Sequence, residues 1–170
     1  MVNYDLFNLQ KEQTVHSEII DISKITKKVR DDIIEEKSYE SIDGSCHENA
    51  IYLCNYFYYH SNYEPYLRWG IFDSNNREYT ELKNAEYDGC VHFWVEIPVY
   101  DGWIYTDLFT MSSEPDSIER GDVFTSDRLP HTYYTVENTL FKYHPKMEPE
   151  DLLSYEDIFI LRNDDDVKYI

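Results

Sequence analysis

Three side chains of this sequence are of the types that perform covalent acyl transfer, and they occur in the order Cys46, His92 and Asp107. A cysteine thiolate attacks a carbonyl carbon efficiently only when a base takes its proton and a third group orients that base. A carboxylate that accepts a hydrogen bond from one imidazole nitrogen fixes the tautomer and stabilises the protonated ring. These residues could therefore act as nucleophile, general base and orienting group.

The surroundings of Cys46 favour a nucleophile. Ser45 followed by Glu48 is a capping box, which predicts that a helix over Ser45–His60 begins with Ser45 as its N-cap. Cys46 then lies in the first turn, where the helix dipole stabilises a thiolate and unpaired backbone N–H groups can receive an oxyanion. His47 points about 100° away from Cys46 on such a helix, so we expect it to be a poor base.

His92 lies in the middle of a predicted strand, Val91–Ile97, on the same face as Trp94 and Glu96. A second predicted strand, Trp103–Leu108, carries Tyr105 and Asp107 on one face. We expect Trp94 and Tyr105 to contact the substrate.

The hairpin between these strands decides whether the triad can form. A two-residue turn at Asp101-Gly102 would leave Asp107 far from His92 along the ladder. Contact between them predicts instead that Trp94 lies opposite Tyr105. We therefore expect a wider loop over 98–102, consistent with Pro98, which cannot donate to the ladder.

The rest of the chain predicts a single α+β domain, residues 1–170, with N-terminal helices packed on an antiparallel sheet. Apolar residues at three- and four-residue steps predict an amphipathic helix over Glu18–Lys37. Ala50, Leu53, Cys54 and Phe57 form the expected buried stripe of the second helix. The other predicted elements are a strand over Pro65–Phe72, one or two strands within Thr132–Tyr143, a short helix over Pro149–Ile160, loops over Arg77–Gly89 and Ser112–Asp122, and a solvated tail at Asp164–Asp166.

The net charge of −19 is spread along the chain and disfavours nucleic acid and anionic membranes as partners. Two interpretations remain open: a surface adapted to high salt, as in halophilic proteins, or a basic partner or substrate. Three cysteines without a C-x-x-C pair, and no signal-like or membrane-length apolar segment, predict a cytoplasmic protein without a metal site.

The chain resembles the transglutaminase-like branch of the papain-like cysteine enzymes over residues 40–110. Gly44-Ser45-Cys46 followed by Ala50 is similar to the family's helix start, and His92-Phe93-Trp94-Val95-Glu96 to its His-x-Trp-x-Glu strand. Gly102-Trp103 followed by Asp107 is similar to its third motif. The resemblance implies a papain-like fold, a Cys-His-Asp triad, an acyl-thioester on Cys46 and no cofactor.

The sequence departs from the family at two positions. Leu108 stands where the family often has proline, and Glu40 stands where papain has the glutamine that donates to the oxyanion, so the second oxyanion donor is unassigned. A weaker similarity links Cys46-His47-Glu48 to the arylamine N-acetyltransferases. Three functions stay open: hydrolysis of a peptide or amide-bearing substrate (a cysteine protease or amidase), transglutaminase-type or N-acetyltransferase-like transfer to an amine, and a binding or assembly module without turnover.

Overall fold

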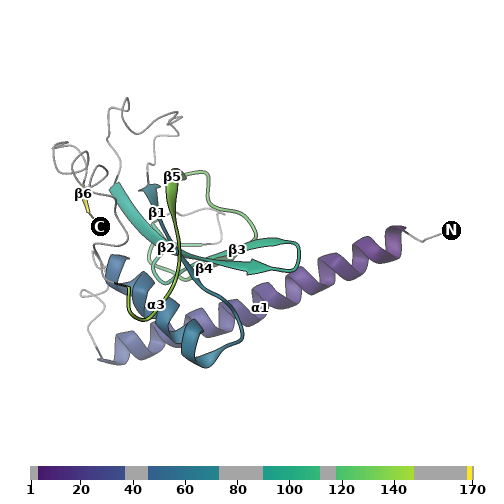
Figure 1. Ribbon diagram of the computed structural model, residues 1–170, viewed down its shortest axis with the longest axis horizontal. Coiled ribbons are helices and arrows are strands. Elements are labelled where there is room, and N and C mark those ends of the chain that lie inside the picture. The colour runs from purple at the N-terminus through teal and green to yellow at the C-terminus, as the bar shows by residue number, and fades with distance from the viewer. Residues whose placement is uncertain (1–3, 37–45, 73–89, 112–117, 148–167, 170) are drawn as a thin grey trace.

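The computed structural model describes residues 4–36, 46–72, 90–111, 118–147 and 168–169. Among these, two helices pack against a curled, mainly antiparallel sheet, so the predicted α+β class is confirmed (Figure 1). The predicted helix over Pro149–Ile160, the loop over Arg77–Gly89 and the acidic tail lie outside the described residues.

Helix α1 (Tyr4–Glu36) has 33 residues and is longer than the sequence pattern predicted. Its buried side chains Ile22, Thr26, Val29 and Ile33 recur at four- and three-residue steps, which places them on one face toward the sheet. The N-terminal part of α1 runs on past the sheet (Figure 1).

Helix α3 (Cys46–His60) begins at the cysteine, and the predicted stripe of Ala50, Leu53, Cys54 and Phe57 is buried. A fully buried leucine or phenylalanine contributes about 1.5–3 kcal/mol relative to an exposed one. This stripe therefore fixes the position of the helix, and with it the position of Cys46. The proposed cap, Ser45, lies outside the described residues.

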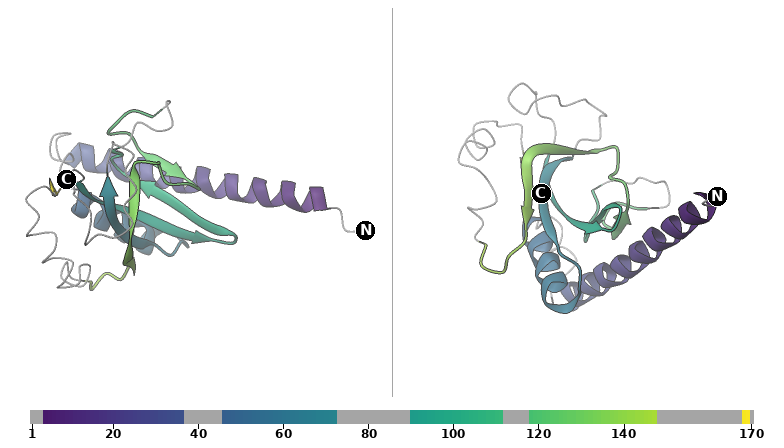
Figure 2. Two further views of the ribbon diagram at one scale, coloured as in Figure 1. Left: turned by 90° about the horizontal axis from the view of Figure 1, so that it is seen from above. Right: turned by 45° about the vertical axis from the view of Figure 1, so that its right-hand side comes forward.

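The sheet has the strand order β4-β3-β2-β1-β5, with β6 pairing parallel to the start of β2. Both ends of the sheet curl toward one another (Figure 2). The strand bounds are β1 Tyr66–Phe72, β2 Cys90–Val99, β3 Gly102–Asp107, β4 Phe124–Ser126, β5 Tyr133–Lys142 and β6 Lys168–Tyr169.

The expected wide loop between β2 and β3 is wrong. Val99 pairs with Gly102, so the hairpin turn contains only Tyr100 and Asp101. Its centre lies one residue earlier than Asp101-Gly102, because Gly102, with φ of +139°, opens β3 instead of closing the turn.

Pro98 lies inside the ladder, opposite Trp103. The pairing of β1 with β2 ends at Glu96, so the β1 side of Pro98 has no strand beside it. A proline whose nitrogen faces that open side removes no hydrogen bond from the hairpin.

Candidate functional site

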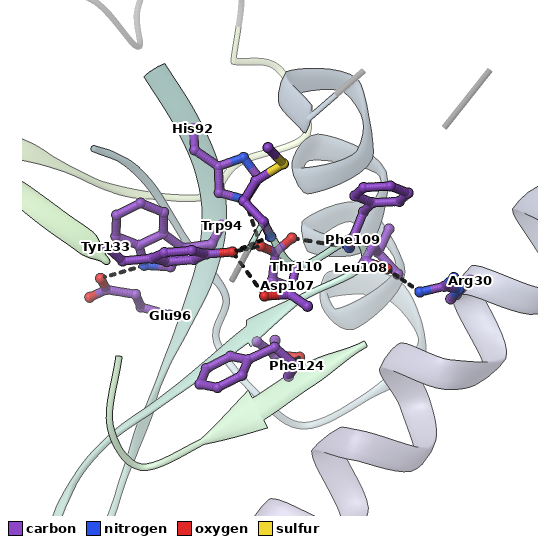
Figure 3. A network of polar contacts seen from close by, with 12 residues as sticks. Arg30, His92, Trp94, Glu96, Asp107, Leu108, Phe109, Thr110, Phe124 and Tyr133 are labelled. Carbon is purple, nitrogen blue, oxygen red and sulfur yellow. Dashed lines mark hydrogen bonds and ion pairs between the residues drawn. The ribbon is translucent and has the colours of Figure 1, made fainter. Parts of the chain in front are cut away.

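The observed register brings His92 and Asp107 together by a route that the sequence did not suggest. Glu96 pairs with Tyr105 and Val95 with Thr106, which would place Asp107 opposite Trp94. His92 is then the diagonal neighbour of Asp107 on the same face, and long side chains bridge such diagonals. The His92 Nε2 and Asp107 Oδ2 atoms lie 2.6 Å apart (Figure 3).

This contact fixes the proton on His92. An ionised carboxylate only accepts hydrogen bonds, so Nε2 carries the proton and donates it to Asp107. Nδ1 is consequently the nitrogen left for chemistry. It is buried, and among the described residues no hydrogen bond to it meets normal geometry.

The thiol of Cys46 also influences the His92 ring. His92 is 1% exposed, and burial alone lowers the pKa of an imidazole. The charge and hydrogen bond of Asp107, with a smaller contribution from the thiol of Cys46, outweigh burial and raise the pKa of His92 to about 10. The thiol and the ring therefore interact, although their alignment falls short of a full hydrogen bond, as is common in unliganded sites.

Asp107 is held by three donors. Its Oδ2 also accepts the hydroxyl proton of Tyr133 at 2.8 Å, and its Oδ1 accepts the backbone N–H of Phe109 at 3.2 Å. The segment Leu108–Met111 is buried, and Arg30 of α1 donates to the carbonyl oxygens of Leu108, at 3.1 Å, and of Gly121. Helix α1 thus anchors the chain immediately after Asp107 (Figure 3).

Trp94 does not face solvent. Its side chain is 1% exposed, and its ring lies 5.2 Å from the ring of Tyr133. Its indole N–H donates to Glu96 at 3.0 Å, and Glu96 pairs through both carboxylate oxygens with Arg68. In this conformation Trp94 supports His92 from within the core and has almost no surface for a substrate.

Gly70 on β1 makes room for that indole. A Cβ atom there would come within 2.4 Å of the Trp94 ring and 2.3 Å of the carbonyl oxygen of Tyr134. Tyr105, the other expected substrate contact, is half-buried beside Glu96, and burial and that carboxylate raise its pKa.

His47 and Cys54 are both held by packing. The ring of His47 packs edge-on against Phe93 at 4.9 Å, and burial lowers its pKa, so it is neutral at pH 7. Cys54 is fully buried in the core, and burial raises the pKa of its thiol. The side chain of Cys90 lies outside the described part of the structure.

Tyr133 is the site residue that sequence reasoning missed. It lies at the start of β5, within the Tyr- and Thr-rich segment that was assigned only as strand. The chain contains 17 tyrosines, and no spacing singles this one out.

Comparison with protein-family models, with curated proteins and with solved structures found no match to this chain. Within the described residues, no cluster of His, Cys, Asp and Glu could hold a metal ion. The same part of the chain contains no helix that is long and apolar enough to cross a bilayer.

Proposed function

We propose that this protein is a cysteine-dependent acyl-transfer enzyme with Cys46 as nucleophile, His92 as general acid and base, and Asp107 as the orienting carboxylate. The observation that carries the proposal is that two side chains, Asp107 and Cys46, both act on the buried ring of His92. His92 donates Nε2–H to Asp107 at 2.6 Å, and the thiol of Cys46, in the first turn of α3, contributes to the raised pKa of the same ring.

The raised pKa of His92 sets the resting state of the site. An imidazole with a pKa of about 10 is protonated at neutral pH. In the proposed ion pair the proton on Nδ1 is the one that Cys46 has given up, which leaves a thiolate beside an imidazolium that is hydrogen-bonded to Asp107. Such an ion pair makes a thiol nucleophilic without a metal or a cofactor.

The reaction follows from these positions. The thiolate of Cys46 forms a bond to the carbonyl carbon of an amide, and the oxyanion is received by backbone N–H groups in the first turn of α3. His92 gives its Nδ1 proton to the leaving nitrogen, the C–N bond breaks and an acyl-thioester forms. His92 then takes a proton from water or an incoming amine, which displaces the acyl group and restores the thiolate.

The proposed fold family is the transglutaminase-like branch of the papain-like enzymes. The helix that begins at Cys46, the strand that carries His92 and the strand that ends at Asp107 follow one another in that order. The substrate proposed is a peptide or another amide-bearing molecule. A neutral or cationic one suits the net charge of −19.

A binding module without turnover is the second candidate, and the burial of the site favours it. Cys46 is 7% exposed and His92 is 1% exposed, so this conformation offers a substrate little of the thiol. A binding module predicts that no acyl group is ever carried by Cys46.

Trapping of the acyl-enzyme tests the proposal. The protein is mixed with p-nitrophenyl acetate and with a small library of activated amides, and quenched in acid. Intact and peptide mass spectra should show one acyl adduct on Cys46. The adduct should be absent from Cys46→Ala and retained in Cys54→Ala, the matched variant of a buried core thiol. Acyl groups that appear equally in Cys46→Ala would overturn the proposal.

A further inference from the structure

The hydroxyl of Tyr133 is fixed in one orientation by its surroundings. The backbone N–H of Met111 donates to the Tyr133 oxygen at 3.0 Å, and the hydroxyl of Thr110 lies 3.2 Å from the same oxygen. Asp107 Oδ2, at 2.8 Å, only accepts hydrogen bonds, so the tyrosine proton points to Asp107. Thr110 is left to donate.

The ring of Tyr133 is held separately from its hydroxyl. It meets the His92 ring edge-on with the centroids 5.3 Å apart, and it lies tilted against Trp94. Tyr133 is 6% exposed, and its hydroxyl points toward Asp107 beside the contact between His92 and Asp107 (Figure 3). Removal of the oxygen alone should therefore leave the ring, and its packing, in place.

We propose that Tyr133 is a positioning residue of the acyl-transfer site: its hydroxyl holds Oδ2 of Asp107 in line with Nε2 of His92. The proposal rests on the function proposed above. Oδ2 carries two donors and Oδ1 carries the N–H of Phe109, so the carboxylate cannot rotate away from the ring. A carboxylate held in place stabilises the imidazolium, and the imidazolium stabilises the thiolate of Cys46.

The test is the pH profile of Cys46 alkylation. The rate of iodoacetamide addition to Cys46 is measured by peptide mass spectrometry from pH 4 to 10 in the wild type, Tyr133→Phe and Tyr143→Phe. Tyr143 is the matched control, because its hydroxyl donates to Asn55 at 2.9 Å from another part of the molecule. Circular dichroism and melting temperature establish that each variant folds.

We expect Tyr133→Phe to raise the pH of half-maximal alkylation by about one unit, the equivalent of one charge-assisted hydrogen bond. At any pH well below the wild-type midpoint its rate should fall about tenfold. Tyr143→Phe should keep the wild-type profile even where its melting temperature drops. A profile of Tyr133→Phe that superimposes on the wild type, in a folded protein, would overturn the positioning role.

The two proposals fail in different ways. If wild-type Cys46 alkylates like an ordinary thiol, the acyl-transfer function fails. If the wild type shows a reactive thiol at low pH and Tyr133→Phe matches it, only the role of Tyr133 fails. Should Tyr133→Phe not fold, NMR of the wild type decides: a slowly exchanging Tyr133 hydroxyl proton with a cross-peak to the His92 Nε2 proton supports the role. Rapid exchange of that hydroxyl with water contradicts it.

Discussion

Burial and neighbouring groups shift the pKa of His92 in opposite directions. Burial disfavours the imidazolium, whereas the Asp107 carboxylate and the Cys46 thiol favour it, and the pKa rises to about 10. A group that binds its proton more tightly in the folded than in the unfolded state stabilises the fold while it is protonated. That contribution is complete below the unfolded value of about 6.5 and is lost as the pH rises through the folded value.

This linkage is best measured without the thiol of Cys46. In the proposed ion pair Cys46 releases a proton when His92 binds one, and the two changes would cancel in the pH dependence of stability. In Cys46→Ala the free energy of unfolding should fall as the pH rises above about 6.5, with a slope approaching about 1.4 kcal/mol per pH unit. Urea denaturation at a series of pH values provides the measurement. In Cys46→Ala/His92→Gln the free energy of unfolding should not show this fall above about pH 6.5. Parallel pH dependence in the two proteins would show that His92 is not held protonated.

Some of the residues at the candidate site could be placed from the sequence, and others could not. The contact between His92 and Asp107 could be predicted, because strand alternation places both on one face, although the register that joins them was not the expected one. The catalytic roles of Cys46, His92 and Asp107 stay predictions. The contact of Tyr133 with His92 could not be predicted, because it depends on where the tertiary fold places β5. Nothing in the sequence distinguishes this tyrosine among the 17 in the chain. The burial of Trp94 could not be predicted, because strand alternation shows which face a residue shares, not what covers that face.

At the scale of elements, buried threonines connect α1 to β3 and β4. The Thr26 hydroxyl donates to the Ile22 carbonyl and lies 2.8 Å from the Thr106 hydroxyl. Thr106 in turn contacts the carbonyl oxygen of Phe124 and the hydroxyl of Thr125 on β4. Since Thr106 directly precedes Asp107, this connection fixes the end of β3 from which the carboxylate projects.

A double-mutant cycle measures that connection. Thr26→Val and Thr106→Val should each reduce the free energy of unfolding by about 0.5–1.5 kcal/mol, because each removes one hydrogen-bond partner of the other buried hydroxyl. The double variant should lose less than the sum of the two, with a coupling of about 1 kcal/mol. Strict additivity in urea denaturation would mean that the two hydroxyls do not interact.

Helices and strands with a clear apolar period were predicted correctly, whereas the hairpin loop and the shortest strand were not. The buried stripe of α3 and the strands β1, β2 and β3 were predicted to within a few residues. The hairpin loop was predicted too wide, because contact between His92 and Asp107 was taken to require Trp94 opposite Tyr105. A tight turn at Tyr100-Asp101 instead makes His92 and Asp107 diagonal neighbours, which long side chains can bridge. Strand β4 has three residues and was missed, since a strand that short has no period to detect.

For the whole molecule, the dominant feature is charge. A net charge of −19 on 170 residues produces repulsion that favours the unfolded chain. If the surface is adapted to high salt, the melting temperature should keep rising from low salt to molar KCl. Ordinary repulsion between surface charges is already screened at about 0.1–0.2 M. A flat or falling curve above that range would remove salt adaptation and favour a basic partner.

The reactivity of the three thiols tests the central claim most directly. The protein is labelled briefly with iodoacetamide at pH 7, and the adducts on Cys46, Cys54 and Cys90 are quantified by peptide mass spectrometry. An ion pair with His92 predicts that Cys46 reacts at least about tenfold faster than the other two, and that His92→Gln removes the difference. Equal labelling of the three thiols, or a Cys46 that reacts as fast in His92→Gln, would contradict the account.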